Sequence, residues 1–183
     1  MTTRTLTIAS ALVVLLSSAA RADQSWTFEA GQGLVSVEVG PRAARLNAVS
    51  VTLTGQVREL DSGEFRAEVR IPLSSFSTGS AARDASLAEP VAKDGDLVFE
   101  GTAPQLKDGR LRFAGTLTVH GVTQPLVLNL VATRIDGRLF GHASFGLSLR
   151  AFNIALPAGT PDDVHVDVDA GLRPQRTTVA TRD

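Results

Sequence analysis

Apolar and polar residues alternate along much of this chain, and this period of two constrains the fold more than any other feature. From Phe65 to Leu73 every second residue is apolar, while Arg66, Glu68 and Arg70 stand between them. A strand with one buried face and one solvated face produces this pattern, because successive side chains point to opposite sides. The same period recurs in residues 35–39, 111–119, 126–130 and 164–168. The sequence therefore predicts an all-β protein.

Glycine-containing turns separate the alternating runs. They stand at Asp61-Ser62-Gly63, Asp94-Gly95, Asp108-Gly109, His120-Gly121 and Asp136-Gly137. Glycine supplies the positive φ of a tight hairpin, so consecutive strands should be antiparallel. We expect about eight strands, near residues 26–30, 33–40, 46–60 (a bent or broken pair), 64–73, 96–103, 110–119, 126–135, 138–149 and 164–171. Such a meander tends to close into a β-barrel because closure removes exposed edges, and its interior is filled by side chains or holds one slender ligand.

The N-terminal 22 residues have the composition of a secretory signal peptide. Arg4 precedes an apolar run from Leu6 to Leu16, and small residues follow as far as Ala22. The run is shorter than the roughly 20 residues of a membrane-spanning helix. We expect a signal peptide over 1–22, one barrel domain over 23–174, a disordered polar tail over 175–183, and a periplasmic protein. Cysteine is absent, so the core must form without disulfides.

Two segments interrupt the alternation. Residues 74–93 include Ala81 to Ala88, a two-turn helix that Pro90 would end, and they form a crossover or a lid over one mouth of the barrel. Residues 150–163 carry Phe152, Ile154 and Leu156 among prolines and glycine, so this segment should also pack over a mouth.

Catalytic and metal-binding patterns are weak in this sequence. His120 falls in a turn, and His142 and His165 fall on the polar side of their strands, where solvated surface residues are expected. The pairs Asp162-Asp163 and Asp167/Asp169 suit a solvated loop and strand better than a calcium site. No Gly-x-Ser-x-Gly elbow or glycine-rich phosphate loop occurs. We predict no catalytic residue, no cofactor and no metal, and the interspersed charges argue against nucleic acid as a partner.

The apolar sides of the strands should line the interior of the barrel. We predict that these residues form the inward, lumen-lining set: Val37, Phe65, Val69, Ile71, Phe99, Phe113, Leu117, Leu128, Leu130, Phe145, Leu147 and Val166. Arg83 and Arg150 are candidates to hold an anionic head group, because guanidinium pairs well with phosphate oxygens. On spacing alone, Arg83 with Asp84 fits a local ion pair or helix cap better than a head-group site.

Three segments resemble the YceI-like family of periplasmic polyisoprenoid-binding proteins: Ser75-Phe76-Ser77-Thr78-Gly79, Arg83-Asp84 and the run from Leu117 to Leu126. That family has a Ser-Ile-x-Thr-Gly segment, an Arg-Asp pair and a Leu-Thr-Ile-x-Gly-Val-Thr-x-Pro-Val segment in the same order. The similarity runs from Trp26 to about Arg173 and includes Asp163-Val164-His165-Val166. The resemblance implies a lipocalin-like barrel that encloses a long isoprenoid or related lipid.

Three functions follow in order of preference. The first is noncatalytic carriage or sequestration of an apolar, chain-like lipid such as a polyisoprenoid or an isoprenoid quinone. The second is a small periplasmic hydrolase or isomerase that uses residues at the mouth of the barrel. The third is an envelope adaptor that binds another protein and whose barrel is filled by its own side chains. The sequence leaves a homodimer open.

Overall fold

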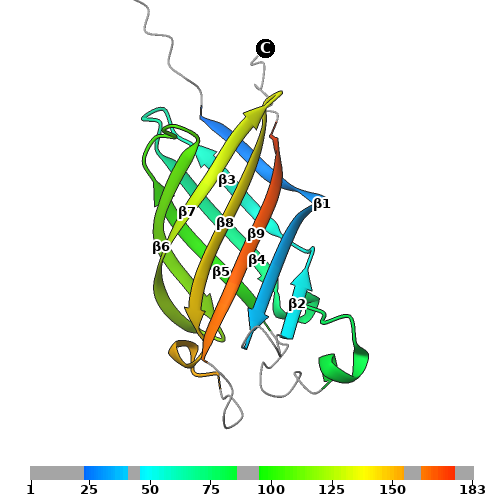
Figure 1. Ribbon diagram of the computed structural model, residues 1–183. Helices are drawn as coiled ribbons and strands as arrows, with labels where there is room; N and C mark the ends of the chain where they lie inside the picture. Colours follow the sequence, from blue (N-terminus) through cyan, green and yellow to red (C-terminus); the bar gives the residue numbers. More distant parts are fainter. Residues whose placement is uncertain (1–22, 41–45, 86–94, 155–161, 176–183) are drawn as a thin grey trace, which may run out of the picture.

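A computed structural model describes residues 23–40, 46–85, 95–154 and 162–175, which form a β-barrel (Figure 1). The strands in these residues are β1 (Gln24–Val39), β2 (Leu46–Ser50), β3 (Thr54–Glu59), β4 (Phe65–Pro72), β5 (Asp96–Ala103), β6 (Arg110–Val119), β7 (Val122–Ile135), β8 (Arg138–Ser148) and β9 (Asp163–Pro174). Two 3-10 turns, η2 (Leu73–Ser75) and η3 (Arg150–Phe152), follow β4 and β8. The signal peptide expected over 1–22 and tail residues 176–183 lie outside the described residues.

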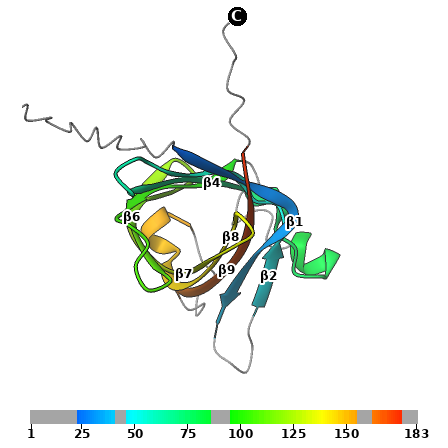
Figure 2. The same cartoon turned by 90° about the horizontal axis from the view of Figure 1, so that it is seen from above.

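The barrel closes through β1, which pairs with both β3 and β9. Its register along β9 shifts between Phe28 and Gly33, and beyond this bulge β1 pairs with β2 instead of β3. Every pairing is antiparallel, and eight strands without β2 form the closed ring seen in Figure 2. The predicted all-β antiparallel barrel is therefore confirmed.

The strand boundaries follow the sequence pattern with two instructive differences. Residues 26–30 and 33–40 are halves of one bent strand, because the bulge keeps both on β9. Strand β7 begins at Val122 and not at residue 126, because the two-residue turn His120-Gly121 sets Val119 directly opposite Val122. Residues 46–60 form the expected broken pair, β2 and β3.

The helical excursion is not a lid over the mouth in its described part. Residues 81–85 are helical and lie outside the barrel wall, beside β2 (Figures 1 and 2). The physical reason is that Ser77, just before this helix, forms a backbone bridge with Val49 of β2, which holds the segment against the outer strand. The end of the expected helix, residues 86–88, falls outside the described residues.

The segment after β8 does pack over a mouth, as expected for its described part. Turn η3 lies inside the ring of strands when the barrel is viewed along its axis (Figure 2). Phe152 and Ile154 are 3% and 7% exposed and join the larger core cluster. Asn153 ends the turn in the left-handed conformation, with φ of 58°. Apolar burial therefore fixes η3 in one end of the barrel.

The apolar interior consists of two clusters rather than one. The larger contains Trp26, Phe65, Phe99, Phe113 and Phe152, and the smaller contains Val35, Leu53, Ile71, Val164 and Val166. Phe99 and Phe113 meet edge to face, with ring centroids 6.4 Å apart. The division places fully buried side chains in two separate regions of the barrel.

A candidate ligand-binding lumen

The twelve side chains predicted to point inward all belong to the two core clusters, but they fall into two groups. Six are buried: Phe65, Phe99, Phe113, Leu117, Ile71 and Val166. Six retain accessible surface: Val37, Val69, Leu128, Leu130, Phe145 and Leu147. Inward-facing residues of a completely filled and closed barrel would all be covered, so the second group contains the candidate residues for lining a lumen.

This space lies where the two clusters meet. Five partly exposed side chains pack against both clusters: Phe28, Val69, Leu97, Leu147 and Leu149. They come from β1, β4, β5 and β8 and from the residue just after β8, so they surround the interior rather than line one wall. These five side chains are therefore the candidate lining of an apolar lumen between the clusters.

The wall is unpaired on one side of this lumen. Strands β7 and β8 pair from Ile135↔Arg138 to Leu130↔Ala143, and the pairing ends there although both strands continue. Beyond this point Leu126 and Leu128 of β7 and Phe145 and Leu147 of β8 point inward and are partly exposed. We call this separation of residues 122–129 and 144–148 the β7–β8 seam. It gives apolar side chains of the lumen access to the surface.

Two residues of β7 adapt it to the seam. Pro125 is paired with Thr116 of β6, but at this position β7 is not paired with β8. The missing N–H of proline therefore removes no hydrogen bond between β7 and β8. A proline on such an edge also blocks pairing with another strand. Gln124 points inward and its Nε2 donates to Ala151 O over 2.8 Å, so it fastens η3 across the lower end of the seam.

The opposite end of the barrel is closed by residues that the sequence analysis missed. Trp26 is 0% exposed, stacks on Phe65 with ring centroids 6.3 Å apart, and donates its ring N–H to Gly137 O over 2.8 Å. Arg134 lies 4.9 Å from the Trp26 ring centroid and binds Glu59 over 2.8 Å. Glu59 and Arg134 occupy apolar, inward positions of their strands, and that break in alternation is the signal that could have revealed them.

The Arg83-Asp84 pair serves the loop outside the barrel. Asp84 accepts hydrogen bonds from the Thr78 N–H at 2.8 Å, the Thr78 hydroxyl at 2.6 Å and the Ser77 hydroxyl at 2.9 Å. Arg83 is exposed and donates to Thr78 O at 3.3 Å. The Ser-Phe-Ser-Thr-Gly and Arg-Asp motifs are thus two halves of one hydrogen-bonded loop. Arg83 therefore lies outside the barrel wall and not at a mouth, because Asp84 anchors its helix to this loop.

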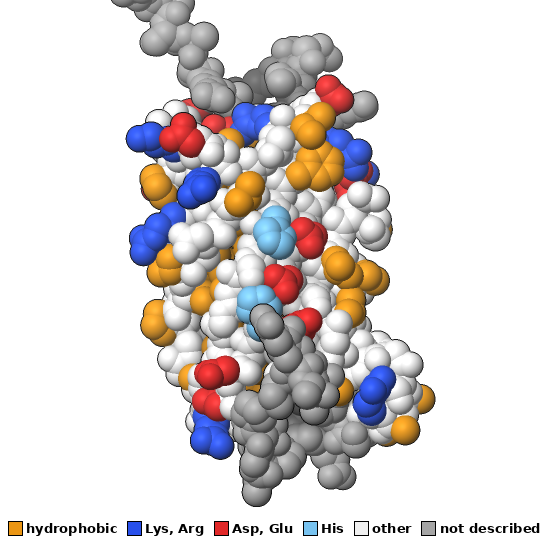
Figure 3. Space-filling view, in the orientation of Figure 1, with side chains coloured by type: hydrophobic (Ala, Val, Ile, Leu, Met, Phe, Trp, Pro, Cys, Tyr) orange, Lys and Arg blue, Asp and Glu red, His pale blue; other side chains and the backbone are white. Residues whose placement is uncertain are grey.

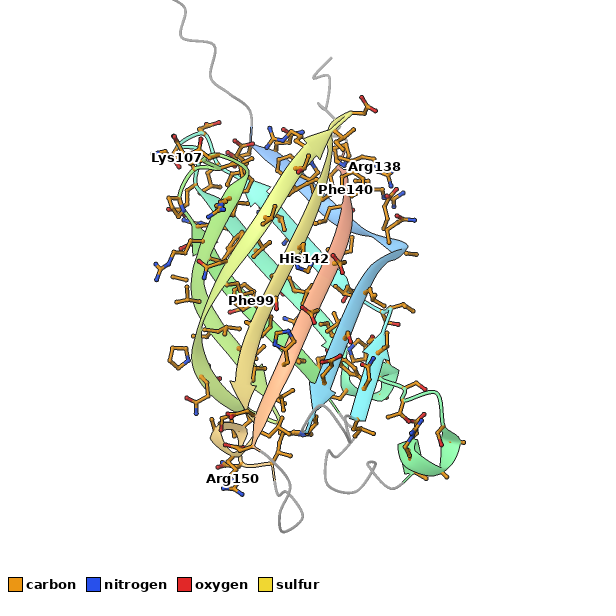
Figure 4. The ribbon with its side chains drawn as sticks, viewed as in Figure 1. Phe99, Lys107, Arg138, Phe140, His142 and Arg150 are labelled. Carbon is orange, nitrogen blue, oxygen red and sulfur yellow. The ribbon has the colours of Figure 1, made fainter. Side chains whose placement is uncertain are left out.

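Arg150, in contrast, lies at the end of the barrel that η3 occupies. Figure 4 shows it at the opposite end from Arg138 and Phe140. Its backbone N–H donates to Asp162 Oδ1 over 2.8 Å, and Asp162 Oδ2 accepts from the Ser148 hydroxyl over 2.5 Å. The Ser148 and Arg150 hydrogen bonds hold the pKa of Asp162 below its usual value. The Arg150 side chain is exposed at this rim.

The histidines of β8 and β9 stand on the outer face of the barrel (Figures 3 and 4). His142 Nδ1 is 2.9 Å from Asp169 Oδ1, beside a shallow outer hollow of about 320 Å³ that Phe140 and Val131 also line. His165 Nε2 contacts both the Ser144 hydroxyl at 3.0 Å and Asp167 Oδ2 at 3.3 Å. A serine–histidine–aspartate relay needs the two partners on different ring nitrogens, so this trio has the wrong geometry for one.

The described part of the chain offers little support for other chemistries. Among these residues no group of three or more histidine, cysteine or carboxylate side chains could hold a metal ion. Nor does any helix in them have the length and apolar character needed to cross a bilayer. The apolar lumen is the feature of the described residues that best fits a binding site.

Comparison with known proteins agrees with this geometry. The model of the YceI-like domain matches residues 22–172. The chain belongs to the YceI-like domain family. No curated protein matches it.

Solved structures of this family and its neighbours share the fold at low sequence identity. BcnA of Burkholderia cenocepacia superimposes with a TM-score of 0.70 at 13% identity, over 79% of this chain and 98% of that one. A polyisoprenoid binding domain from Saccharophagus degradans gives 0.67 at 16%, over 82% and 98%. The YceI protein of Campylobacter jejuni gives 0.63 at 16%, over 75% and 90%. These matches establish the barrel as the family fold.

Proposed function

We propose that this YceI-like protein binds an apolar, chain-like lipid of the polyisoprenoid or isoprenoid quinone type in its lumen. The observation that carries the proposal is the accessible apolar surface of inward-facing residues between the two core clusters. Burial of hydrocarbon there contributes about 25 cal/mol per Å² removed from water, so a long chain binds with few polar contacts. The solved relative from Saccharophagus degradans, described as a polyisoprenoid binding domain, supports the same ligand class.

The proposed role is carriage or sequestration without catalysis. The polar side chains on the outer face do not form a relay, and at the closed end Glu59 pairs with Arg134 and the Trp26 N–H binds Gly137 O. A lumen lined by aliphatic side chains holds a ligand but supplies neither a nucleophile nor a general base to it.

The rim of the lumen supplies a candidate contact for a polar head group. Arg150 is exposed at the η3 end, where the β7–β8 seam also ends. If the bound lipid is anionic, its head group would pair with this guanidinium. Arg150→Ala should then weaken binding of a prenyl phosphate but not of the corresponding prenyl alcohol, measured by titration calorimetry, whereas equal loss for both would remove Arg150 from this role.

A lumen-filling variant tests the function directly. Leu128→Trp places a large ring in the lumen, whereas Val127→Trp places the same ring on the outer face of the same strand, where Val127 is 42% exposed. Protein purified from its own envelope should release a lipid into organic solvent, identified by mass spectrometry. We expect Leu128→Trp to lose this lipid and Val127→Trp to retain it. Wild-type protein that is free of lipid and binds no added prenyl alcohol would refute the proposal.

We further propose that the chain is exported to the periplasm, where it meets its lipid. The signal-peptide pattern of residues 1–22 supports this location. The N-terminal sequence of protein isolated from a bacterial envelope fraction tests it, since export predicts a mature chain that begins at Asp23.

A further inference from the structure

We propose that Glu59, Arg134 and Trp26 form a closed floor of the lumen that sets the length of hydrocarbon chain the protein can bury. This inference rests on the proposed function, because it assigns a specificity determinant to the same lumen. It concerns how far a chain can enter, which the apolar lining alone does not define.

The Glu59–Arg134 ion pair crosses the full width of the barrel. Glu59 lies on β3 and Arg134 on β7, and these strands are four steps apart in either direction, through β4, β5 and β6 or through β1, β9 and β8. They are therefore opposite walls of the eight-strand ring. Arg134 Nη2 and Glu59 Oε2 are nevertheless 2.8 Å apart. A chain cannot pass between two atoms at that distance.

Trp26 fills the space beside this ion pair. Its ring contacts the Arg134 guanidinium on one side, with 4.9 Å from the guanidinium carbon to the ring centroid, and it stacks on Phe65 at an interplanar angle of 17°. Its N–H is fixed on Gly137 O of the β7–β8 turn. Glu59 is 8% exposed and pairs with Arg134, so removing Arg134 alone would take this cation from a buried carboxylate. The floor is thus held in place from β1, β3, β4 and β7.

Inward-facing apolar side chains lead from the η3 end toward this floor. Phe28, which packs against both clusters and is partly exposed, is the next inward residue of β1 after Trp26. On β7 the inward-facing positions run from Gln124, which holds η3, to Arg134. These positions span about 33 Å of strand, which is about 25 Å along the axis for a strand tilted by about 40°. A hydrocarbon tail of that extended length would fill the lumen.

The floor also fixes the direction of the ligand. The charge of Arg134 is compensated by Glu59, and its guanidinium lies over the Trp26 ring, so the floor offers a head group no unpaired charge. The exposed Arg150 stands at the other end. The tail therefore meets the floor and the polar head remains at the η3 rim.

A series of prenyl alcohols from farnesol through geranylgeraniol to long polyprenols measures this limit. With wild-type protein we expect affinity to rise with chain length and then level off, because carbons beyond the floor remain in water. The double variant Glu59→Ala/Arg134→Ala removes both members of the ion pair together. In it, affinity should continue to rise, by about tenfold for every two additional methylenes buried. Native mass spectrometry of competing mixtures gives the ranking.

Arg138→Ala is the matched control, because Arg138 lies at the same end but on the outer face, over Phe140 and paired with Glu29. It should keep the wild-type length limit. Trp26→Leu opens the same floor while leaving the ion pair intact, and it replaces the double variant should that fail to fold by circular dichroism. A length limit unchanged in the opened variant refutes the floor but leaves lipid binding standing. Absence of binding at every length in wild-type protein refutes both.

Discussion

At the scale of single residues, the aromatic core carries much of the stability. Phe113 is 2% exposed and meets Phe99 edge to face. Phe113→Ala should lower the free energy of unfolding by about 3–5 kcal/mol, since both transfer energy and a cavity are involved. Leu128→Ala should cost less, because Leu128 borders the accessible lumen and is only partly covered. Urea denaturation of both variants tests the contrast, and an equal loss would contradict an open lumen.

Asp162 provides a pH-dependent contact at the same scale. Its pKa is lowered chiefly by the Ser148 hydroxyl and also by the Arg150 N–H. The pKa of Asp162 is lower in the folded state than in the unfolded state. Its ionised form therefore stabilises the fold at pH values above the usual aspartate pKa, and this stabilisation is lost as the pH falls through the folded pKa. The Arg150 amide resonance should titrate below pH 3.8, the ordinary value. An Arg150 amide resonance that titrates at or above pH 3.8, or that titrates in the same way in Asp162→Asn, would contradict this assignment.

At the scale of elements, the β5–β6 pair depends on a close approach between two glycines. Gly101 and Gly115 are directly opposite, and a Cβ on Gly115 would lie 2.0 Å from Glu100 O and 2.6 Å from Gly101 Cα. Gly115→Ala must therefore move backbone, and we expect a large drop in melting temperature. Gly146→Ala is the control, because its Cβ would meet nothing closer than Val164 O at 3.9 Å. Equal melting temperatures for the two variants would show that the strands adjust freely.

The attachment of η3 is a second element-scale property. Gln124 Nε2 bonds Ala151 O across the end of the β7–β8 seam, whereas the buried Phe152 anchors the turn inside the barrel. Gln124→Ala should leave the fold intact but increase amide exchange in residues 149–153. It should also speed release of a bound prenyl alcohol, measured by displacement of a fluorescent lipid. Unchanged release would indicate that the ligand leaves without movement of η3.

At the scale of the whole molecule, the barrel combines a closed end with an opened side. The floor at Trp26 lies at the end of the barrel where β7 pairs with β8, and the seam lies at the other end of β7. The ring is therefore closed in one half although β7 and β8 do not pair in the other. This arrangement suits an apolar chain that is covered along its length but exchanged from one end. The sequence leaves a homodimer open, and sedimentation velocity tests for it.

Alternation and turn residues determine the strands and their directions, since both are local properties of the chain. They place Phe113 and Leu128 inside the wall and His142 and His165 outside it, as the structure does. They do not show which six of the twelve inward residues stay partly exposed, because packing depends on how opposite walls meet. Only the closed ring brings Glu59 to Arg134, residues far apart in sequence whose strands never pair. The tertiary structure therefore decides the shape of the interior, because opposite walls of a barrel meet only when the ring closes.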